Sequence, residues 1–155
     1  DKYGRLYDWE TMMNGEGGSN LVPSGVQGIC PDGWHIPSDE EWKIMEGFAD
    51  QMYLIGDTIF NELDFRGKNA GENLKSTQGW HNAYNGDDIF GFTVLPGGRA
   101  FEDGSFVGLL RDAYYWSCTE ASNNAYFRHF FYFNSDIERN SLPKSYFHSV
   151  RCIKD

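Results

Sequence analysis

Cations, cysteine and long apolar runs are the scarce components of this chain. Its 155 residues include 13 Lys and Arg against 23 Asp and Glu, which gives a formal net charge of −10, and the cations are not clustered. Because phosphate contacts need clustered Lys and Arg, we expect no nucleic-acid partner. No apolar run is long enough to cross a bilayer, so membrane insertion by this domain is not expected either. The N-terminus has no signal-peptide pattern, so we expect any export signal to lie outside this chain.

The chain has only three cysteines, Cys30, Cys118 and Cys152, and none of them stands in a CxxC spacing. This wide separation disfavours a zinc site. Two alternatives stay open: buried free thiols, or a disulfide bond between Cys30 and Cys152. The bond would close a long loop, restrict the unfolded chain by roughly 4 kcal/mol and imply an oxidising compartment. Cys118 would then be unpaired and buried.

Glycine and aromatic residues are abundant, with 18 Gly and 17% Phe, Trp and Tyr, which favours short strands and tight turns. The length is that of one domain, residues 1–155. Ser38, with Glu41 three residues later, forms a capping-box pattern and predicts a helix from about Asp39 to Met52. The apolar residues that recur at helical spacing, and so should be buried, are Trp42, Met45, Phe48, Ala49 and Met52.

The rest of the chain predicts short helical turns and strands. A hairpin is expected around Asp103-Gly104, and helical turns are expected at 9–13 and 58–64. The strands expected from composition and alternation are 4–9, 90–99, 113–119, 125–133 and 149–153. Helix first and many short strands afterwards indicate the α+β class.

Catalytic patterns are missing from the sequence. The four histidines, His35, His81, His129 and His148, form no close ligand pair, and no serine stands in a nucleophile turn. Asp87-Asp88 and Glu102-Asp103 could contribute oxygens to a calcium site, but solvated turns account for them better. We therefore expect no catalytic residue, no metal and no cofactor.

Motifs in order along nearly the whole chain resemble the Fibrobacter succinogenes major paralogous domain, a family of bacterial extracellular modules. The matching motifs are Gly4–Trp9, Cys30–Pro37, Glu41-Trp42, Leu74–Ser76, Gly91-Phe92, Leu95–Arg99, Tyr115–Ser117, Thr119-Glu120 and Ser149–Cys152. The resemblance implies a C-type-lectin-like fold, with one or two helices packed on short, twisted antiparallel strands and long loops. It also implies an extracellular or cell-surface location. The family's N-terminal strands have no counterpart here, which suggests a shorter variant or a trimmed form.

Two further resemblances give different functions. The run from Gly33 to Trp42 is similar to formylglycine-generating enzymes, which share the fold and bind copper through two late cysteines. Here the late cysteines are Cys118 and Cys152, and Cys152 falls in the closing strand, so the oxidase is the weaker alternative. The segment from Ser122 to His148 resembles the variable region of proteins diversified by retroelements. It is rich in the residues that adenine-directed mutagenesis of Asn codons yields, such as Asn, Ser, Tyr, Phe and His.

The strand predicted at 125–133 has aromatic residues on both faces. The family pattern puts the parity of Tyr126, Arg128 and Phe130 in the core, which leaves the other parity outward. Rigid rings beside short polar groups are typical of antibody-like recognition surfaces. The predicted ligand-binding residues, the last eight of them expected in loops, are Phe127, His129, Phe131, Phe133, Asn134, Ser135, Asn140, Ser141, Leu142, Tyr146, Phe147 and His148.

The sequence therefore favours a non-enzymatic recognition module with a protein or glycan ligand on a cell surface. A self-associating structural module that uses the same rings remains an alternative, as does an ordinary aromatic strand core.

Overall fold

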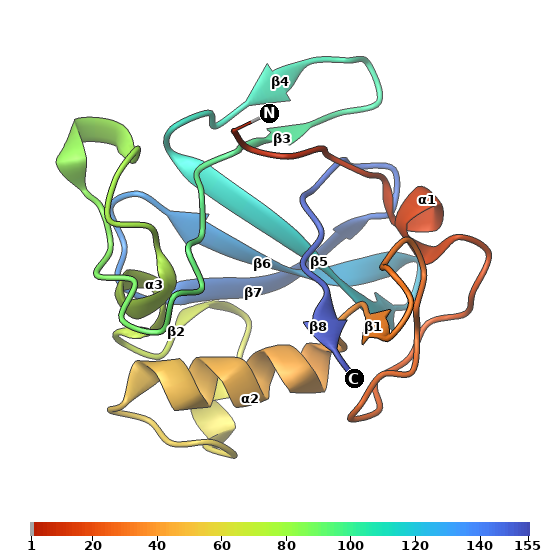
Figure 1. Cartoon of the computed structure of the whole chain (residues 1–155), viewed down its shortest axis with the longest axis horizontal. Helices are drawn as coiled ribbons and strands as arrows, with labels where there is room; N and C mark the ends of the chain where they lie inside the picture. The colour runs from red at the N-terminus through yellow and green to blue at the C-terminus, as the bar shows by residue number, and fades with distance from the viewer. Residues whose placement is uncertain (1) are drawn as a thin grey trace.

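The computed structural model describes residues 2–155 and has the predicted α+β class, with few helices and mostly antiparallel strands (Figure 1). The helices are α1 (Trp9–Met13), α2 (Asp39–Asp50) and α3 (Ala70–Leu74), with 3-10 turns η1 (Thr58–Asn61) and η2 (His81–Ala83). The strands are β1 (Trp34–His35), β2 (Asp64–Arg66), β3 (Arg99–Ala100), β4 (Phe106–Val107), β5 (Asp112–Ala121), β6 (Asn124–Phe131), β7 (Ile137–Pro143) and β8 (Ile153–Lys154). No helix of the described chain is long and apolar enough to span a membrane.

A four-stranded antiparallel sheet in the order β2-β7-β6-β5 forms the centre of the molecule. In Figure 1, α2 lies below this sheet and the β3–β4 hairpin stands above it. The short pair β1–β8 joins the C-terminus to the segment before α2, with Trp34 opposite Lys154. Because β5 and β6 are covered from both sides, each carries large side chains on both faces.

Two apolar clusters lie on opposite faces of β5 and β6. Trp42 of α2 packs with Tyr115 and Phe130 in one cluster. In the other, Trp9 of α1 packs with Trp116 and its neighbours. Since successive strand residues point to opposite faces, this two-sided burial explains the rings at both parities of the sequence.

The capping box at Ser38 is confirmed, because its hydroxyl accepts from the Glu41 amide and the Glu41 side chain accepts from the Ser38 amide. The predicted buried face is only partly correct. Trp42 and Ala49 are buried, but Phe48 is 58% exposed, and Met52 lies beyond the helix end and is exposed as well. The reason is that carboxylates, not rings, occupy much of the helix side that faces the sheet.

Five buried charged side chains join α2 to the sheet. Arg128 of β6 donates to Glu46 and, at 2.7 Å, to Asp39. Arg139 of β7 holds Asp39 through two nitrogens, the closer at 2.8 Å, and Arg66 of β2 lies 2.5 Å from Glu46. Burial alone would raise the pKa of Asp39, but the charges of Arg128 and Arg139 hold it well below its usual range. We call these five residues the buried ion network.

Several predicted strands are wrong or shortened. Residues 90–99 are not a strand, since Gly91, Thr93 and Gly98 have positive φ, which interrupts an extended chain; only β3 begins there, at Arg99. Of 149–153 only Ile153 lies in a strand, and 4–9 contributes one bridge, from Tyr7 to His148. The hairpin around Asp103-Gly104 is confirmed by the pairing of β3 with β4.

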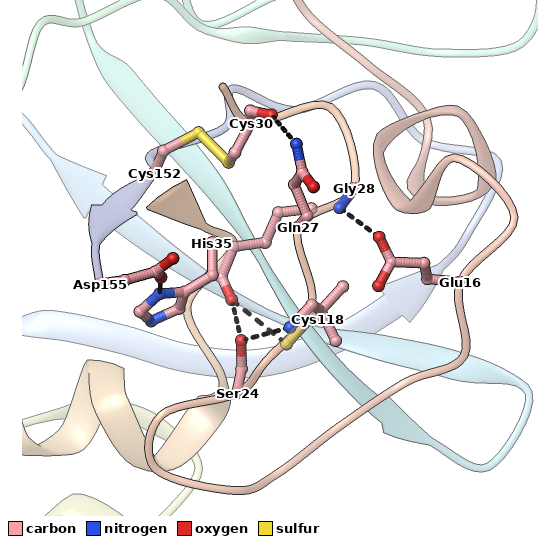
Figure 2. Close-up of a disulfide and its surroundings, with 11 residues drawn as sticks. Glu16, Ser24, Gln27, Gly28, Cys30, His35, Cys118, Cys152 and Asp155 are labelled. Carbon is pink, nitrogen blue, oxygen red and sulfur yellow. Dashed lines mark hydrogen bonds and ion pairs between the residues drawn. A yellow bond between two sulfur atoms is a disulfide. The ribbon is translucent and has the colours of Figure 1, made fainter. Parts of the chain in front are cut away.

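The disulfide bond between Cys30 and Cys152 is present, and Cys118 is a buried free thiol (Figure 2). The bond joins the loop before β1 to the segment before β8, across 122 residues of sequence. It therefore links the segment before β1 covalently to the C-terminal segment.

Alkylation with iodoacetamide tests this cysteine pattern by intact mass. We expect no adduct on the native protein, because Cys118 is buried, and one adduct after denaturation without reductant. Protein that is reduced and denatured before alkylation should give three adducts, one for each cysteine. Three adducts without reductant would contradict the bond.

Replacing Glu46 by Gln tests the buried ion network. The change keeps the shape of the side chain but leaves Arg66 without its carboxylate and Arg128 with Asp39 alone, so we expect the free energy of unfolding to fall by about 3–5 kcal/mol. Urea unfolding measures the loss, and exposed Glu62→Gln is the matched control, expected to change by no more than about 0.5 kcal/mol. A loss for Glu46→Gln as small as that of the control would show that the network contributes little.

Candidate functional site

The predicted outward row of β6 begins in the interior. Phe127 is 3% exposed and His129 is 8% exposed, so the prediction that both lie on the surface is wrong. Phe127 packs in the α1 cluster, where its ring stands edge-on to Trp116 at 6.5 Å. Because α1 and the segment after β7 cover this end of the sheet, the alternation of the strand does not produce exposure here.

Towards its C-terminal end, the same row reaches the surface. Phe131 is half-buried, and Phe133, just past the strand, is 63% exposed. Asn134 and Ser135 follow in the turn and are half-buried. The side chain of Lys75 donates to the main-chain oxygen of Asn134 at 2.8 Å, which anchors this turn to the end of α3. The exposed rings thus stand on a fixed loop.

The predicted loop residues Asn140, Ser141 and Leu142 lie in strand β7, so this part of the prediction is wrong. The polar composition of 137–143 gave no strand pattern, yet pairing with β6 on one side and β2 on the other fixes it as a strand. The amide of Asn140 donates to Asp64 of β2 at 3.1 Å. Leu142 packs against the α1 cluster.

The last three predicted residues lie in the segment that follows β7. Tyr146 and Phe147 are half-buried, and His148 is fully buried, so its predicted place on the surface is wrong. Bridges from Phe147 to Ala100 and from His148 to Tyr7 hold this segment against the rest of the molecule. The His148 ring stacks on Trp116 at 4.1 Å.

Six rings form a continuous line across the open end of the sheet, which we call the aromatic row. Its members, from loop to edge strand, are Tyr84, Phe133, Tyr132, Phe131, His129 and Phe65. Neighbouring centroids lie 4.7 to 6.2 Å apart, within the range of favourable ring contacts. Tyr84 and Phe65 were missed, since nothing in their own segments links them to β6.

His129 is the polar centre of this row. Its Nδ1 lies 2.7 Å from Glu138 and its Nε2 lies 2.6 Å from Asp112, while its ring stacks on Tyr114 at 4.2 Å. Burial alone would lower the pKa of His129, but the hydrogen bonds to Asp112 and Glu138 outweigh it and raise the pKa above 6.5. With both nitrogens held by carboxylates, the protonated form of the ring is favoured.

His148 has the opposite electrostatic environment. Neither of its ring nitrogens has a hydrogen-bond partner among the described residues. Burial, followed by the positive charges of Arg99 and His129, lowers its pKa well below 6.5. The ring is therefore neutral and serves as an aromatic spacer between Trp116 and Tyr114.

The acidic turns and the free thiol have local structural roles. Asp88 accepts from the amide and hydroxyl of Thr93, and Asp103 accepts from the amide of Ser105. Cys118 contacts the main-chain oxygen of Ile36 at 3.4 Å, and burial raises the pKa of its thiol to about 11. Residues 2–155 contain no group of three or more His, Cys, Asp or Glu arranged to hold a metal ion.

NMR titration of the histidine rings tests the two environments. Because the folded pKa of His129 is raised, its contribution to stability is complete below pH 6.5 and is lost as pH rises through the folded pKa. We expect the His129 midpoint above 6.5, and His148 should remain neutral to well below 6.5. The variants His129→Gln and His148→Gln assign the signals. A His129 midpoint below that of a free imidazole would contradict the pairing of its ring with Asp112 and Glu138.

The comparisons with known proteins give one match. The family model described as the Fibrobacter succinogenes major domain matches residues 1–154. No curated protein and no solved structure matches the chain.

Proposed function

We propose that this chain, which belongs to the Fibrobacter succinogenes major domain family, is a non-enzymatic ligand-recognition module of a bacterial cell surface or extracellular protein. The fold that we propose for it is C-type-lectin-like. The observation that carries the proposal is the aromatic row, whose exposed end consists of Phe133 and Tyr84. Large rings left in water on a rigid strand-and-loop frame are typical of binding surfaces.

The groups beside the row suit a polar ligand. Asn140, Asp64 and Glu138 lie at its β2 end, where their amide and carboxylate oxygens stand next to Phe65 and His129. A sugar could stack on the rings and donate hydroxyl hydrogen bonds to these oxygens. A protein loop could use the same groups, so the ligand class is protein or glycan.

The disulfide bond supports an exported protein. Bonds of this kind persist in oxidising compartments and are rare in the cytosol. Cys30 and Cys152 are thus best explained by a mature protein outside the cytoplasm.

The state of the cysteines also favours binding over the oxidase alternative. A copper site of that type needs two late thiols, but Cys152 is bonded to Cys30. Cys118 alone remains, and the pKa of its buried thiol is raised to about 11, which disfavours the thiolate that metals bind.

Diversification of the late segment by a retroelement remains part of the proposal, in a narrower form. Random replacement at Phe127, His129 or His148 would remove buried contacts and cost stability. Variation that preserves the fold would therefore be concentrated at accessible positions, above all Phe133 and its neighbours Asn134 and Ser135.

The double variant Phe133→Ala, Tyr84→Ala tests the proposed surface. Binding of the wild type and the variant to an array of immobilised glycans and polysaccharides is the measurement. We expect the variant to bind at least about tenfold more weakly, because truncating ring anchors at an interface costs more than about 1 kcal/mol each. The melting temperature should stay nearly unchanged, since Phe133 is 63% exposed and Tyr84 45%.

Phe48→Ala is the matched control for this experiment. Phe48 is 58% exposed and lies on α2, below the opposite face of the sheet, so its removal should not alter glycan binding. Equal binding by the double variant and the wild type would place the ligand away from the aromatic row. Light scattering at rising concentration separates a binding surface from self-association through the same rings.

A further inference from the structure

A second hollow lies away from the aromatic row, between the N-terminal segment and the segment that leads into β8. In Figure 1 the segment that leads into β8 passes in front of β5, and the N-terminal segment runs above β5 towards α1. The hollow has a volume of about 420 Å³, at the small end of the range for ligand pockets. Its wall includes Ile29 and Cys152, so the disulfide bond fixes one side of it. We call it the basic pocket.

The lining of the basic pocket carries only positive charge. Lys2, Arg5 and Arg151 line it, and no Asp or Glu among residues 2–155 does. Within residues 2–155, none of the three cations forms an ion pair. In a chain with a net charge of −10, three cations without carboxylate partners around one hollow create a local positive potential.

Arg151 is held at the boundary between the basic pocket and a neighbouring hollow that Phe92 lines. Its guanidinium donates to the main-chain oxygen of Phe92 and lies over the Phe92 ring, 4.2 Å from the centroid. Its remaining N–H groups have no acceptor among the described residues, and they are not buried. A guanidinium with one side fixed and free donors on the other is suited to a carboxylate or another planar anion.

The rest of the lining is rich in hydroxyl groups on a rigid base. Tyr3 and Ser149 are hydroxyl-bearing residues of the wall, and Thr93 also lines it, although its hydroxyl is donated to Asp88. The main chain of Ser149 is bonded to β5 on both sides, to Tyr114 at 2.9 Å and to Trp116 at 3.2 Å. Such a wall can exchange hydrogen bonds with a hydroxylated ligand without moving.

We propose that the basic pocket binds a small acidic sugar, a uronic acid, whose carboxylate lies among Arg5, Arg151 and Lys2. The volume admits a small ligand, the cations select its charge, and the hydroxyl groups match the polarity of its ring. This site is separate from the aromatic row, and it does not rest on the function proposed for that row.

Titration with D-glucuronate, with neutral D-glucose as its counterpart, tests the pocket by isothermal calorimetry of the full chain at low salt. We expect glucuronate to bind at least tenfold more tightly than glucose, because only glucuronate pairs with the cations. Added salt should weaken its binding, since the pocket is open to solvent. Inorganic sulfate is the third probe, and it should bind more weakly than glucuronate because it makes no ring contacts.

Arg5→Gln is the decisive variant, because Arg5 is exposed and its loss should not affect folding. We expect it to weaken glucuronate binding at least tenfold, and Arg151→Gln to do the same if it folds. Arg111→Gln, an exposed cation outside the pocket, is the matched control, and Phe133→Ala should leave glucuronate binding unchanged.

Four results would overturn the proposal. The first is equal affinity for glucose and glucuronate, and the second is full glucuronate binding by Arg5→Gln. Loss of glucuronate binding in Phe133→Ala would move the site to the aromatic row. Sulfate binding as tight as that of glucuronate would overturn the assignment to a sugar.

Discussion

The orientation of β6 depends on the buried ion network beneath it. Arg128 is held between Asp39 and Glu46 of α2, in an interior where an unpaired charge is strongly unfavourable. That constraint fixes which parity of β6 faces α2. Phe127, His129 and Phe131 are consequently directed to the opposite face. The network therefore aligns the strand on which the candidate recognition surface stands.

The opposite face of the sheet changes character along its length. Near α1 it is an ordinary interior, where Phe127 and His148 pack around Trp116. Towards Phe131 and Phe133 the cover ends and the rings reach solvent. His129 lies at the transition, and its two carboxylate partners neutralise a charge that would otherwise be costly so close to the core. The aromatic row is thus an extension of the core rather than a separate patch.

Two surfaces of opposite chemistry follow from this arrangement. The aromatic row combines rings with carboxylate and amide oxygens around His129, whereas the basic pocket presents cations and hydroxyl groups. The segment between β7 and β8 lies next to both regions, since His148 stacks on Tyr114, which in turn stacks on His129, and Arg151 lines the pocket. The disulfide bond at Cys152 restrains that segment, so it contributes to the order of both surfaces.

Local signals in the sequence determined the α+β class, the capping box at Ser38, the hairpin at Asp103-Gly104 and the strand with Arg128 and Phe130 facing inward. The family motifs indicated the family, and Cys30–Cys152 was one of two open alternatives. These features depend on residues close together or on motifs that stand on their own. Tertiary structure decided the burial of Phe127, His129 and His148, since α1 and the segment after β7 cover them. It also decided that polar 137–143 forms a strand and that Tyr84 and Phe65 join the row, because those outcomes depend on partners far away in the chain.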